Sequence, residues 1–292
     1  MKKLPIGIQN ISKILDNQDY IYVDKTVFAW QLIEEGTPYY FMSRPRRFGK
    51  SLFLSTLEEI FRGNKELFQG CHIYHTDYDW EKYPVLLFDF SRIAAESGEA
   101  FKLNLQEFID KLAKSNGISI SGSSMQMRLE NLIESLAKTN RVVILVDEYD
   151  SPIINNLKNL EVAQENRDIL KAFFTTLKSL DKYLKFTFAT GVSKFSQVSL
   201  FSGPNNLKDI TMDPRYAAMM GYTGEEIKHS FSEYIQSIIQ KRKDQGKNPS
   251  TDDILEEVRE WYNGYRFSKE PTYVYNPFST LNYMDEKEAT SY

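Results

Sequence analysis

The stretch that decides the fold is Phe41–Leu54, which reads FMSRPRRFGKSLFL. A strand-like apolar run leads into Phe48-Gly49-Lys50-Ser51 and then into a sequence with the apolar spacing of an amphipathic helix. A phosphate-binding loop needs this order of elements. Backbone N–H groups at a helix N-terminus face an anion, a lysine reaches the terminal phosphates, and a serine hydroxyl holds Mg²⁺. The stretch therefore indicates nucleoside triphosphate chemistry.

The motif in this stretch is incomplete. The full Walker A pattern, G-x-x-x-x-G-K-[ST], has its first glycine at position 44, where this chain has Arg44. A bare Gly-Lys-Ser/Thr occurs by chance in roughly one chain of this length in seven. Gly49-Lys50-Ser51 therefore needs support from the rest of the chain.

A second half-motif, of the Walker B type, supplies that support. Val142–Val146 is the most hydrophobic strand candidate, and it runs directly into Asp147 and Glu148. In phosphate-loop enzymes an aspartate at the tip of a buried strand binds Mg²⁺, and a neighbouring glutamate polarises the attacking water. We predict Ser51 and Asp147 as metal ligands, and Lys50 and Glu148 as catalytic residues. The alternative is a strand that ends at a solvated acidic turn.

The remaining nucleotide contacts are assigned to the loop and to one later strand. The predicted nucleotide-binding residues are Arg46, Arg47, Phe48, Gly49, Lys50, Ser51, Leu52 and Thr190. Because Pro45 removes one N–H donor, the arginines at 44, 46 and 47 would compensate as bidentate phosphate partners. Alternatively, they pair with an acidic surface or form an interface.

Two further assignments each have an open alternative. Thr190 or Ser193, at the tip of the strand over 186–190, would sense the γ-phosphate; the alternative is turn chemistry around Gly191. Arg215 is a candidate arginine finger, and the alternative is an ordinary surface arginine after Asp213-Pro214.

Apolar patterning predicts an α/β fold. Strands are expected at 38–43, 85–90, 142–146, 186–190 and 208–212, with a short one at 20–23. Helices between the main strands imply a parallel sheet covered on both faces. After Tyr222 the chain becomes helical, and Thr223 with Glu226 predicts a capping box. We predict an ATPase domain with an N-terminal arm over 1–221 and a small helical or winged-helix-like lid over 222–292.

Composition excludes several other functions. The 292 residues carry a net charge of −4, and 222–292 contains many acidic residues, so charge does not support nucleic acid as a partner. The single cysteine, Cys71, allows no internal disulfide. No apolar run approaches the length of a membrane span, so no membrane association is expected. Without a signal-peptide pattern at the N-terminus, the expected location is the cytoplasm.

A series of motifs resembles the bacterial AAA-ATPase-like family over about residues 5–285. In chain order these motifs are RPRRFGKS, ILVDEYD, ATGVSKFS, NNLKDIT, GYTGEEI, WYNGYRF and YNPFS. The resemblance implies a P-loop NTPase of the additional-strand type, with sheet order 5-1-4-3-2 and a winged-helix-like tail. It also implies an ATP site at Gly49, Lys50, Ser51, Asp147 and Glu148. The missing first glycine resembles the family's own variant of the loop.

Members of that family usually continue into a nuclease-superfamily domain with a PD-(D/E)xK core. The 292 residues contain no second segment long enough to hold such a domain, so no nuclease activity is expected of them. The sequence therefore predicts an AAA-like ATPase with ATP or ADP and Mg²⁺ as cofactors, and with slow or partner-triggered hydrolysis. The alternatives are a nucleotide-responsive switch or scaffold without useful hydrolysis, and a DNA-associated module of a nuclease system. Other expected partners are a second copy of the chain or, in longer relatives, the nuclease domain in cis.

Overall fold

The computed structural model describes residues 1–16, 18–193, 207–262 and 264–291. In this part of the chain, five parallel strands form one sheet. The strands are β1 (Tyr39–Ser43), β2 (Val85–Asp89), β3 (Val142–Asp147), β4 (Leu184–Gly191) and β5 (Lys208–Asp209). Their order is β2-β3-β4-β1-β5, which is 5-1-4-3-2 read from the other edge. The predicted parallel sheet and its order are confirmed.

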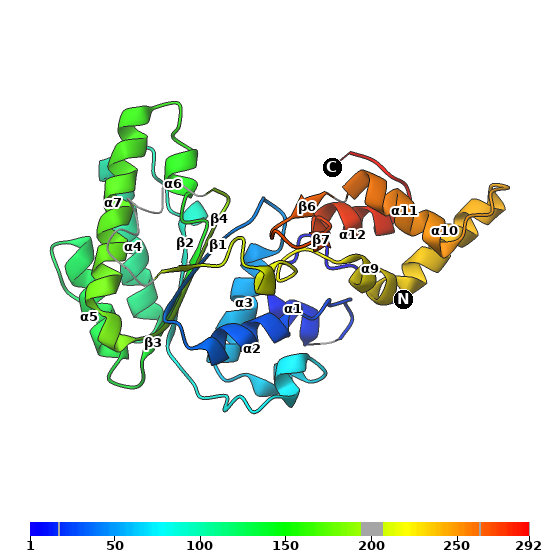
Figure 1. Ribbon diagram of the computed structural model, residues 1–292. Coiled ribbons are helices and arrows are strands. Elements are labelled where there is room, and N and C mark those ends of the chain that lie inside the picture. Colours follow the sequence, from blue (N-terminus) through cyan, green and yellow to red (C-terminus); the bar gives the residue numbers. More distant parts are fainter. Residues whose placement is uncertain (17, 194–206, 263, 292) are drawn as a thin grey trace.

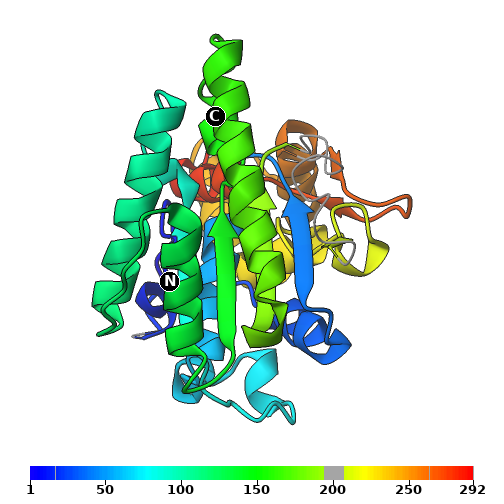
Figure 2. The same cartoon turned by 90° about the vertical axis from the view of Figure 1, so that its left-hand side faces the viewer.

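Helices cover both faces of this sheet (Figures 1 and 2). One face packs against α4 (Gly98–Ser115), α5 (Met125–Leu136) and α7 (Leu160–Ser179). The other face packs against α1 (Ile11–Leu15), α2 (Thr26–Glu35) and α3 (Lys50–Phe61).

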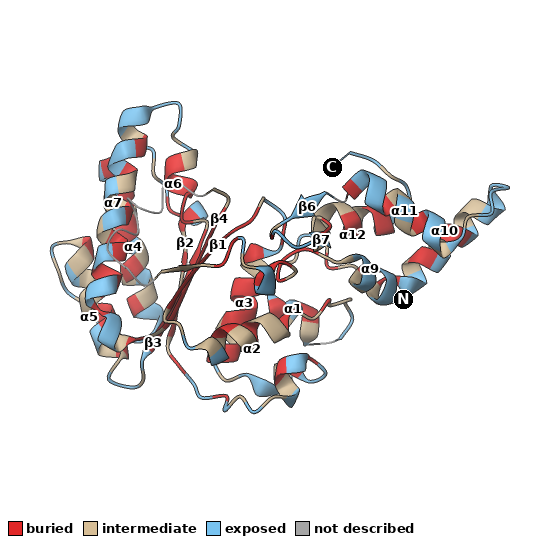
Figure 3. Ribbon diagram, in the orientation of Figure 1, coloured by how far each residue is buried: buried red, intermediate tan, exposed pale blue. Residues whose placement is uncertain are grey.

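Strand β3 shows why helices must pack on both faces of the sheet. Ile144 and Val146 belong to the first core, and Val143 and Leu145 to the second, because alternate strand residues point to opposite faces. From Val142 to Val146 the strand is therefore apolar, and it is buried on both faces (Figure 3).

The C-terminal region is a third packing unit beside α1 and α3 (Figure 1). It consists of α9 (Gly224–Ser230), α10 (Ser232–Asp244), α11 (Thr251–Tyr262), β6 (Tyr265–Arg266), β7 (Tyr273–Val274) and α12 (Pro277–Glu286). Strands β6 and β7 pair antiparallel; we call Tyr265–Val274 the 265–274 hairpin. The core of this region includes Val23 of the N-terminal arm, and Leu4, Ile6 and Ile21 pack against it. The division of the chain at Tyr222 stays a prediction.

Short elements complete the description. Helix α6 spans Ser151–Ile154, and 3₁₀ turns span Lys65–Phe68, His72–His75, Phe90–Arg92, Asp181–Tyr183 and Pro214–Tyr216. The predicted capping box of Thr223 and Glu226 is confirmed at the start of α9. Among the helices of the described residues, none has the length and apolar character needed to cross a membrane.

Two element predictions were wrong in part. The segment 20–23 is not a strand, because only Tyr20 forms a bridge, to Lys3, while Ile21 and Val23 turn toward the C-terminal core. The strand expected over 208–212 stops at Asp209. Its next residues turn so that the hydroxyl of Thr211 accepts a hydrogen bond from the Ser43 N–H.

Candidate functional site

The carboxyl ends of β1, β3 and β4 lie together at one edge of the sheet. Ser43 at the end of β1 is in register with Gly191 of β4, and Val146 near the end of β3 is in register with Ala189. Beyond β1, residues Arg44–Gly49 form a loop, here called the 44–49 loop, that leads directly into α3. Ligands of open α/β sheets bind at this edge, so the site is built here.

Asp147 is the centre of the polar contacts at this edge. Its Oδ2 accepts a hydrogen bond from Ser51 Oγ at 2.5 Å, and its Oδ1 accepts one from Thr190 Oγ1 at 2.6 Å. The Glu148 N–H also donates to Oδ1, at 3.1 Å. Hydroxyls from α3 and β4 thus orient one carboxylate on β3. Mg²⁺ prefers oxygen ligands and takes few of them from the protein, so Ser51 with Asp147 fits its needs.

Lys50 is buried at the first position of α3, and its amine reaches back across the loop. Its Nζ donates to the carbonyl oxygens of Arg44 and Pro45, at 3.0 Å each. Burial lowers the pKa of this amine, and the nearby carboxylates of Asp147 and Glu148 oppose the shift. A cation at a helix N-terminus is unfavourable by itself, so a bound anion would stabilise it.

Glu148 combines an unusual backbone with an altered acidity. Its φ of 48° lies in the left-handed region, which residues other than glycine rarely adopt and which costs about 1–3 kcal/mol. Burial, together with the neighbouring charge of Asp147, raises the pKa of its carboxyl group. Such a carboxylate is closer to the proton affinity that a general base needs near neutral pH.

The 44–49 loop also uses positive φ at two positions. Gly49 has φ 86° and caps α3, and Arg47 has φ 67°. A Cβ at Gly49 would meet no atom within 4 Å, so backbone conformation and not space requires glycine there.

A cavity of about 320 Å³ opens over the loop. Glu148, loop residues, the N-terminal arm and the start of α12 together form its wall. Its lining residues are Arg46, Arg47, Gly49, Lys50, Ser51, Leu52, Glu148, Pro5, Gly7, Ile8, Gln9, Tyr222, Pro277, Phe278 and Leu281. The volume falls within the usual range of ligand sites, about 300–1,000 Å³.

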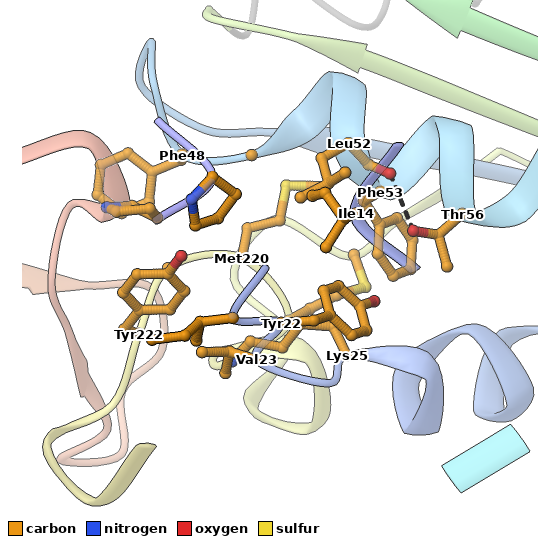
Figure 4. A pocket seen from close by; sticks show the side chains of 16 residues that line it. Ile14, Tyr22, Val23, Lys25, Phe48, Leu52, Phe53, Thr56, Met220 and Tyr222 are labelled. Atoms are coloured by element: carbon orange, nitrogen blue, oxygen red, sulfur yellow. Dashed lines mark hydrogen bonds between the residues drawn. The ribbon is translucent and has the colours of Figure 1, made fainter. Parts of the chain in front are cut away.

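A smaller, mostly apolar pocket of about 60 Å³ adjoins this cavity. The two share Pro5, Gly49, Leu52, Tyr222 and Pro277 as lining residues. In Figure 4, Tyr22, Met220 and Tyr222 lie across this pocket from Leu52 and Phe53.

The predicted site residues are thus distributed as follows. Six loop and helix residues line the larger cavity, whereas Phe48 lines only the smaller pocket. Thr190 lines neither and lies behind Asp147 as its hydrogen-bond donor. Ser193 is not beside Asp147, because its N–H and hydroxyl donate to Asp150 at 2.7 and 2.8 Å.

Two arginines lie away from the cavity wall. Arg215 pairs with Asp213 and Glu35 and lines neither pocket. Arg44 is not a phosphate partner at the surface, and it forms no ion pair with another described residue. It is 1% exposed and donates to the carbonyls of Thr211 at 2.7 Å and Tyr216 at 3.3 Å.

Sequence reasoning missed the far wall of the cavity. No helix was predicted to begin in the segment YVYNPFS, but α12 begins at Pro277. Asn276 caps this helix by accepting from the N–H groups of Phe278 and Ser279. An N-cap asparagine followed by proline is a helix-start signal that was present in the sequence. No local signal places this helix, or the arm over 5–9, beside the 44–49 loop.

Comparisons with known proteins give a family match and a curated relative. Residues 5–201 match a family described as "Predicted AAA-ATPase". A curated protein of Azotobacter chroococcum mcd 1, described as "Uncharacterized protein in vnfD 5'region", is 43% identical over 294 aligned residues. The match covers 100% of this chain and 53% of the relative. The chain therefore spans about half the length of the curated relative that it matches.

Proposed function

The chain belongs to the AAA-ATPase-like family described as "Predicted AAA-ATPase", and from this premise we propose that it is a Mg²⁺-dependent ATP-binding protein with slow or partner-triggered ATPase activity. The observation that carries the proposal is the 2.5 Å hydrogen bond between Ser51 and Asp147. It joins the residue after the loop lysine to the strand-end carboxylate, which is the juxtaposition that a Mg²⁺–triphosphate site requires. The strand order and the helix that follows the 44–49 loop support a P-loop NTPase fold.

The phosphates are held by the loop and the start of α3. Residues 49–52, at the N-terminus of α3, line the cavity, and the N–H groups of a helix N-terminus favour an anion. Lys50 leaves its two carbonyl partners and binds the terminal phosphates. Arg46 is exposed and, within the described residues, has no hydrogen bond or ion pair, so it is available to a phosphate oxygen. Arg47 stacks 4.1 Å from the ring centre of Phe278 and lines the same cavity.

Ser51 and Asp147 hold the metal, and Thr190 keeps the carboxylate of Asp147 in place. Bound Mg²⁺ would neutralise charge on the phosphate oxygens. Glu148, at the cavity wall, accepts a hydrogen bond from the attacking water and orients it. Its raised pKa makes it a better proton acceptor than an ordinary glutamate.

The nucleoside occupies the other end of the cavity. Its walls there are the arm residues Gly7 and Ile8 and the apolar side chains of Pro277 and Leu281. These surfaces suit the flat, weakly polar faces of a purine.

Two substitutions test this function. Lys50→Ala should abolish Mg²⁺–ATP binding in a calorimetric titration, because the loop loses its phosphate-binding cation. Glu148→Gln should keep binding and lower turnover by about 10²–10⁴-fold, because only the positioned base is lost. Lys111→Ala and Glu134→Gln, at exposed positions of α4 and α5, are the matched controls. Hydrolysis at the parent rate in both site variants would contradict the mechanism.

A second candidate is a nucleotide-responsive switch that binds without useful hydrolysis. The observation that favours it is the loop itself, since Pro45 offers no N–H and Lys50 is already engaged by carbonyl oxygens. Phosphate release distinguishes the two. Tight ATP binding with no release, across protein concentrations and with candidate partners, would select the switch.

A further inference from the structure

The side chain of Arg44 connects the 44–49 loop to a distant part of the chain. Its guanidinium donates to the carbonyls of Ser43 (3.0 Å), Thr211 (2.7 Å) and Tyr216 (3.3 Å). Its Cζ lies 4.0 Å from the ring centre of Phe267, in the 265–274 hairpin. No ion pair of the described residues includes Arg44. Burial lowers its pKa to about 9, so the group is charged at neutral pH.

Phe48, at the other end of the loop, contacts the same hairpin. It is buried, and its ring centre lies 4.7 Å from that of Tyr265 and 5.5 Å from that of Phe267. Both contacts are edge-on, which is a favourable arrangement for aromatic pairs. Arg44 and Phe48 bracket Pro45, Arg46 and Arg47. The hairpin therefore contacts both ends of the segment that turns over the cavity.

These contacts depend on one another. A buried cation is costly unless dipoles, an aromatic face or an opposite charge compensate it, and the carboxylate of Asp209 acts on Arg44 only at longer range, without an ion pair among the described residues. Arg44 stays buried only while its three carbonyl partners and Phe267 keep their positions. Displacing the hairpin would remove the aromatic face from the guanidinium and two ring partners from Phe48. The conformation of the hairpin is therefore coupled to the conformation of the loop.

Lys50 links this unit to the phosphate position. Its amine bonds the carbonyl oxygens of Arg44 and Pro45, which lie at the start of the loop. A triphosphate would draw the amine away and release both carbonyls. Nucleotide would thus act on the backbone carbonyls at the start of this loop, while the hairpin contacts the side chains of Arg44 and Phe48 in the same loop.

We propose that the 265–274 hairpin is a working part of the nucleotide site: through Arg44 and Phe48 it sets the shape of the 44–49 loop, and a bound triphosphate in turn changes the stability of the hairpin. This inference rests on the proposed function. Arg44 is a positioning residue and not a phosphate ligand. Coupling of this kind is reciprocal, so a change in the hairpin alters nucleotide affinity by the same factor as nucleotide alters the hairpin.

The decisive variant is Arg44→Gly, which restores the full pattern G-x-x-x-x-G-K-S. If the arginine were only a tolerated departure, the variant would bind Mg²⁺–ATP at least as well as the parent. The inference predicts the opposite, a loss of tenfold or more. Phe267→Leu should show a similar loss, because it keeps apolar volume but removes the aromatic face. Arg44→Lys should lie between them and the parent, since it keeps the charge but not the planar fork.

Tyr273→Ala is the matched control, because Tyr273 lies in the same hairpin but is 46% exposed. It should bind nucleotide like the parent. The double variant of Arg44→Gly with Phe267→Leu should bind Mg²⁺–ATP no more weakly than the single variant of lower affinity, because both substitutions remove the same contact. Circular dichroism and denaturation checks establish that each variant is folded, and Phe267→Leu alone decides the matter if Arg44→Gly does not fold.

Hydrogen exchange gives the readout that a merely structural role would not change. In the parent, Mg²⁺–ATP should alter the exchange rates of amides in residues 265–274, and in folded Arg44→Gly this response should disappear. Equal nucleotide affinity of parent and Arg44→Gly, or a hairpin whose exchange ignores nucleotide, would overturn the inference. In either case the parent still binds and Lys50→Ala does not, so the proposed function survives. A parent that does not bind Mg²⁺–ATP refutes both.

Discussion

The carboxylate of Asp147 has both oxygens engaged by hydrogen bonds. Thr190 is fully buried and does not line the cavity, and its hydroxyl donates to this carboxylate. Ser51 holds the second oxygen from the helix side. A ligand that is fixed in this way needs little rearrangement when a metal binds, and partners behind a ligand commonly tune metal affinity.

We expect Thr190→Val to weaken Mg²⁺–ATP binding by roughly 10–100-fold while leaving Mg²⁺-free ATP binding nearly unchanged. The substitution keeps the shape and removes one hydrogen bond from Asp147. Thr187→Val, on the same strand, is the control, because the buried hydroxyl of Thr187 has no partner in the described structure. Paired titrations with and without Mg²⁺ measure the effect. Equal losses in both variants would show that Thr190 has no particular relation to the metal.

Local sequence predicted that two short motifs would lie together at one edge of the sheet. Gly49-Lys50-Ser51 and Asp147-Glu148 follow strands, and the carboxyl ends of parallel strands share one edge. Arg44 was not predictable in this way. Its position depends on Phe267, on Thr211 and on the carbonyl of Tyr216, and no pattern around position 44 specifies those contacts.

At the scale of elements, an ion pair between buried Lys25, at the start of α2, and partly buried Glu226 joins α2 to α9. Lys25 Nζ donates to Glu226 Oε1 at 2.5 Å and to the carbonyl of Ala218 at 2.9 Å. The other carboxylate oxygen of Glu226 closes the capping box on the Thr223 N–H. Burial lowers the pKa of Lys25 and Glu226 opposes that shift, so the ammonium depends on this partner.

Glu226→Ala should therefore lower the free energy of unfolding by about 2–3 kcal/mol, because it leaves a buried ammonium unpaired and opens the capping box. Glu226→Gln should cost less, since the amide still serves the cap. Glu225→Ala, at the exposed neighbouring position, should stay within about 0.5 kcal/mol of the parent. Denaturant titration measures all three. An equal effect of Glu226→Ala and Glu225→Ala would rule out the ion pair as a tie between the elements.

Apolar periodicity predicted most elements but not their partners. The main strands, the helix after the 44–49 loop and the presence of helices between the strands were predicted from spacing alone. The segment 20–23 looked equally strand-like, yet its apolar residues pack on the C-terminal helices. Apolar periodicity predicts that a side chain is buried. It does not identify the element against which that side chain packs, because tertiary contacts determine the partner.

In the whole molecule, the two ends of the chain close around the site. The N-terminal arm lies against α10, where Tyr234 donates to the carbonyl of Lys2 at 2.7 Å, and Figure 1 shows the N-terminus beside that helix. The arm and α12 both contribute to the wall of the cavity that Glu148 also lines. The strand order was expected only from the family resemblance. A lid over 222–292 was predicted, but its meeting with the N-terminal arm was not, because that depends on contacts between distant parts of the chain.

At the β5 edge of the sheet, Glu35 is the centre of a cluster of ionic contacts with Lys208 and Arg215. Although burial opposes it, hydrogen bonds from Lys208 and Arg215 lower the pKa of Glu35 from 4.5 to about 2. A lowered folded-state pKa means stability that is present above the unfolded pKa and is lost as the pH falls toward the folded one.

The stabilisation from Glu35 should therefore be complete near neutral pH and decline between about pH 4.5 and pH 2. Glu35→Gln should be less stable than the parent at pH 7, and the difference should shrink through that interval. The measurement is the free energy of unfolding of both proteins as a function of pH. A stability difference between the two proteins that stays constant from pH 6 to pH 3 would contradict a lowered pKa of Glu35, because about half of the decline should occur in that range.

The most direct test of the account is a crystal structure with Mg²⁺ and a non-hydrolysable ATP analogue. We predict the phosphates against the N–H groups of Gly49–Leu52, with Lys50 Nζ moved from the carbonyls of Arg44 and Pro45 onto the terminal phosphates. The metal should lie on Ser51 Oγ, beside Asp147. An analogue bound elsewhere on the chain, or no bound analogue at saturating concentration, would contradict the account.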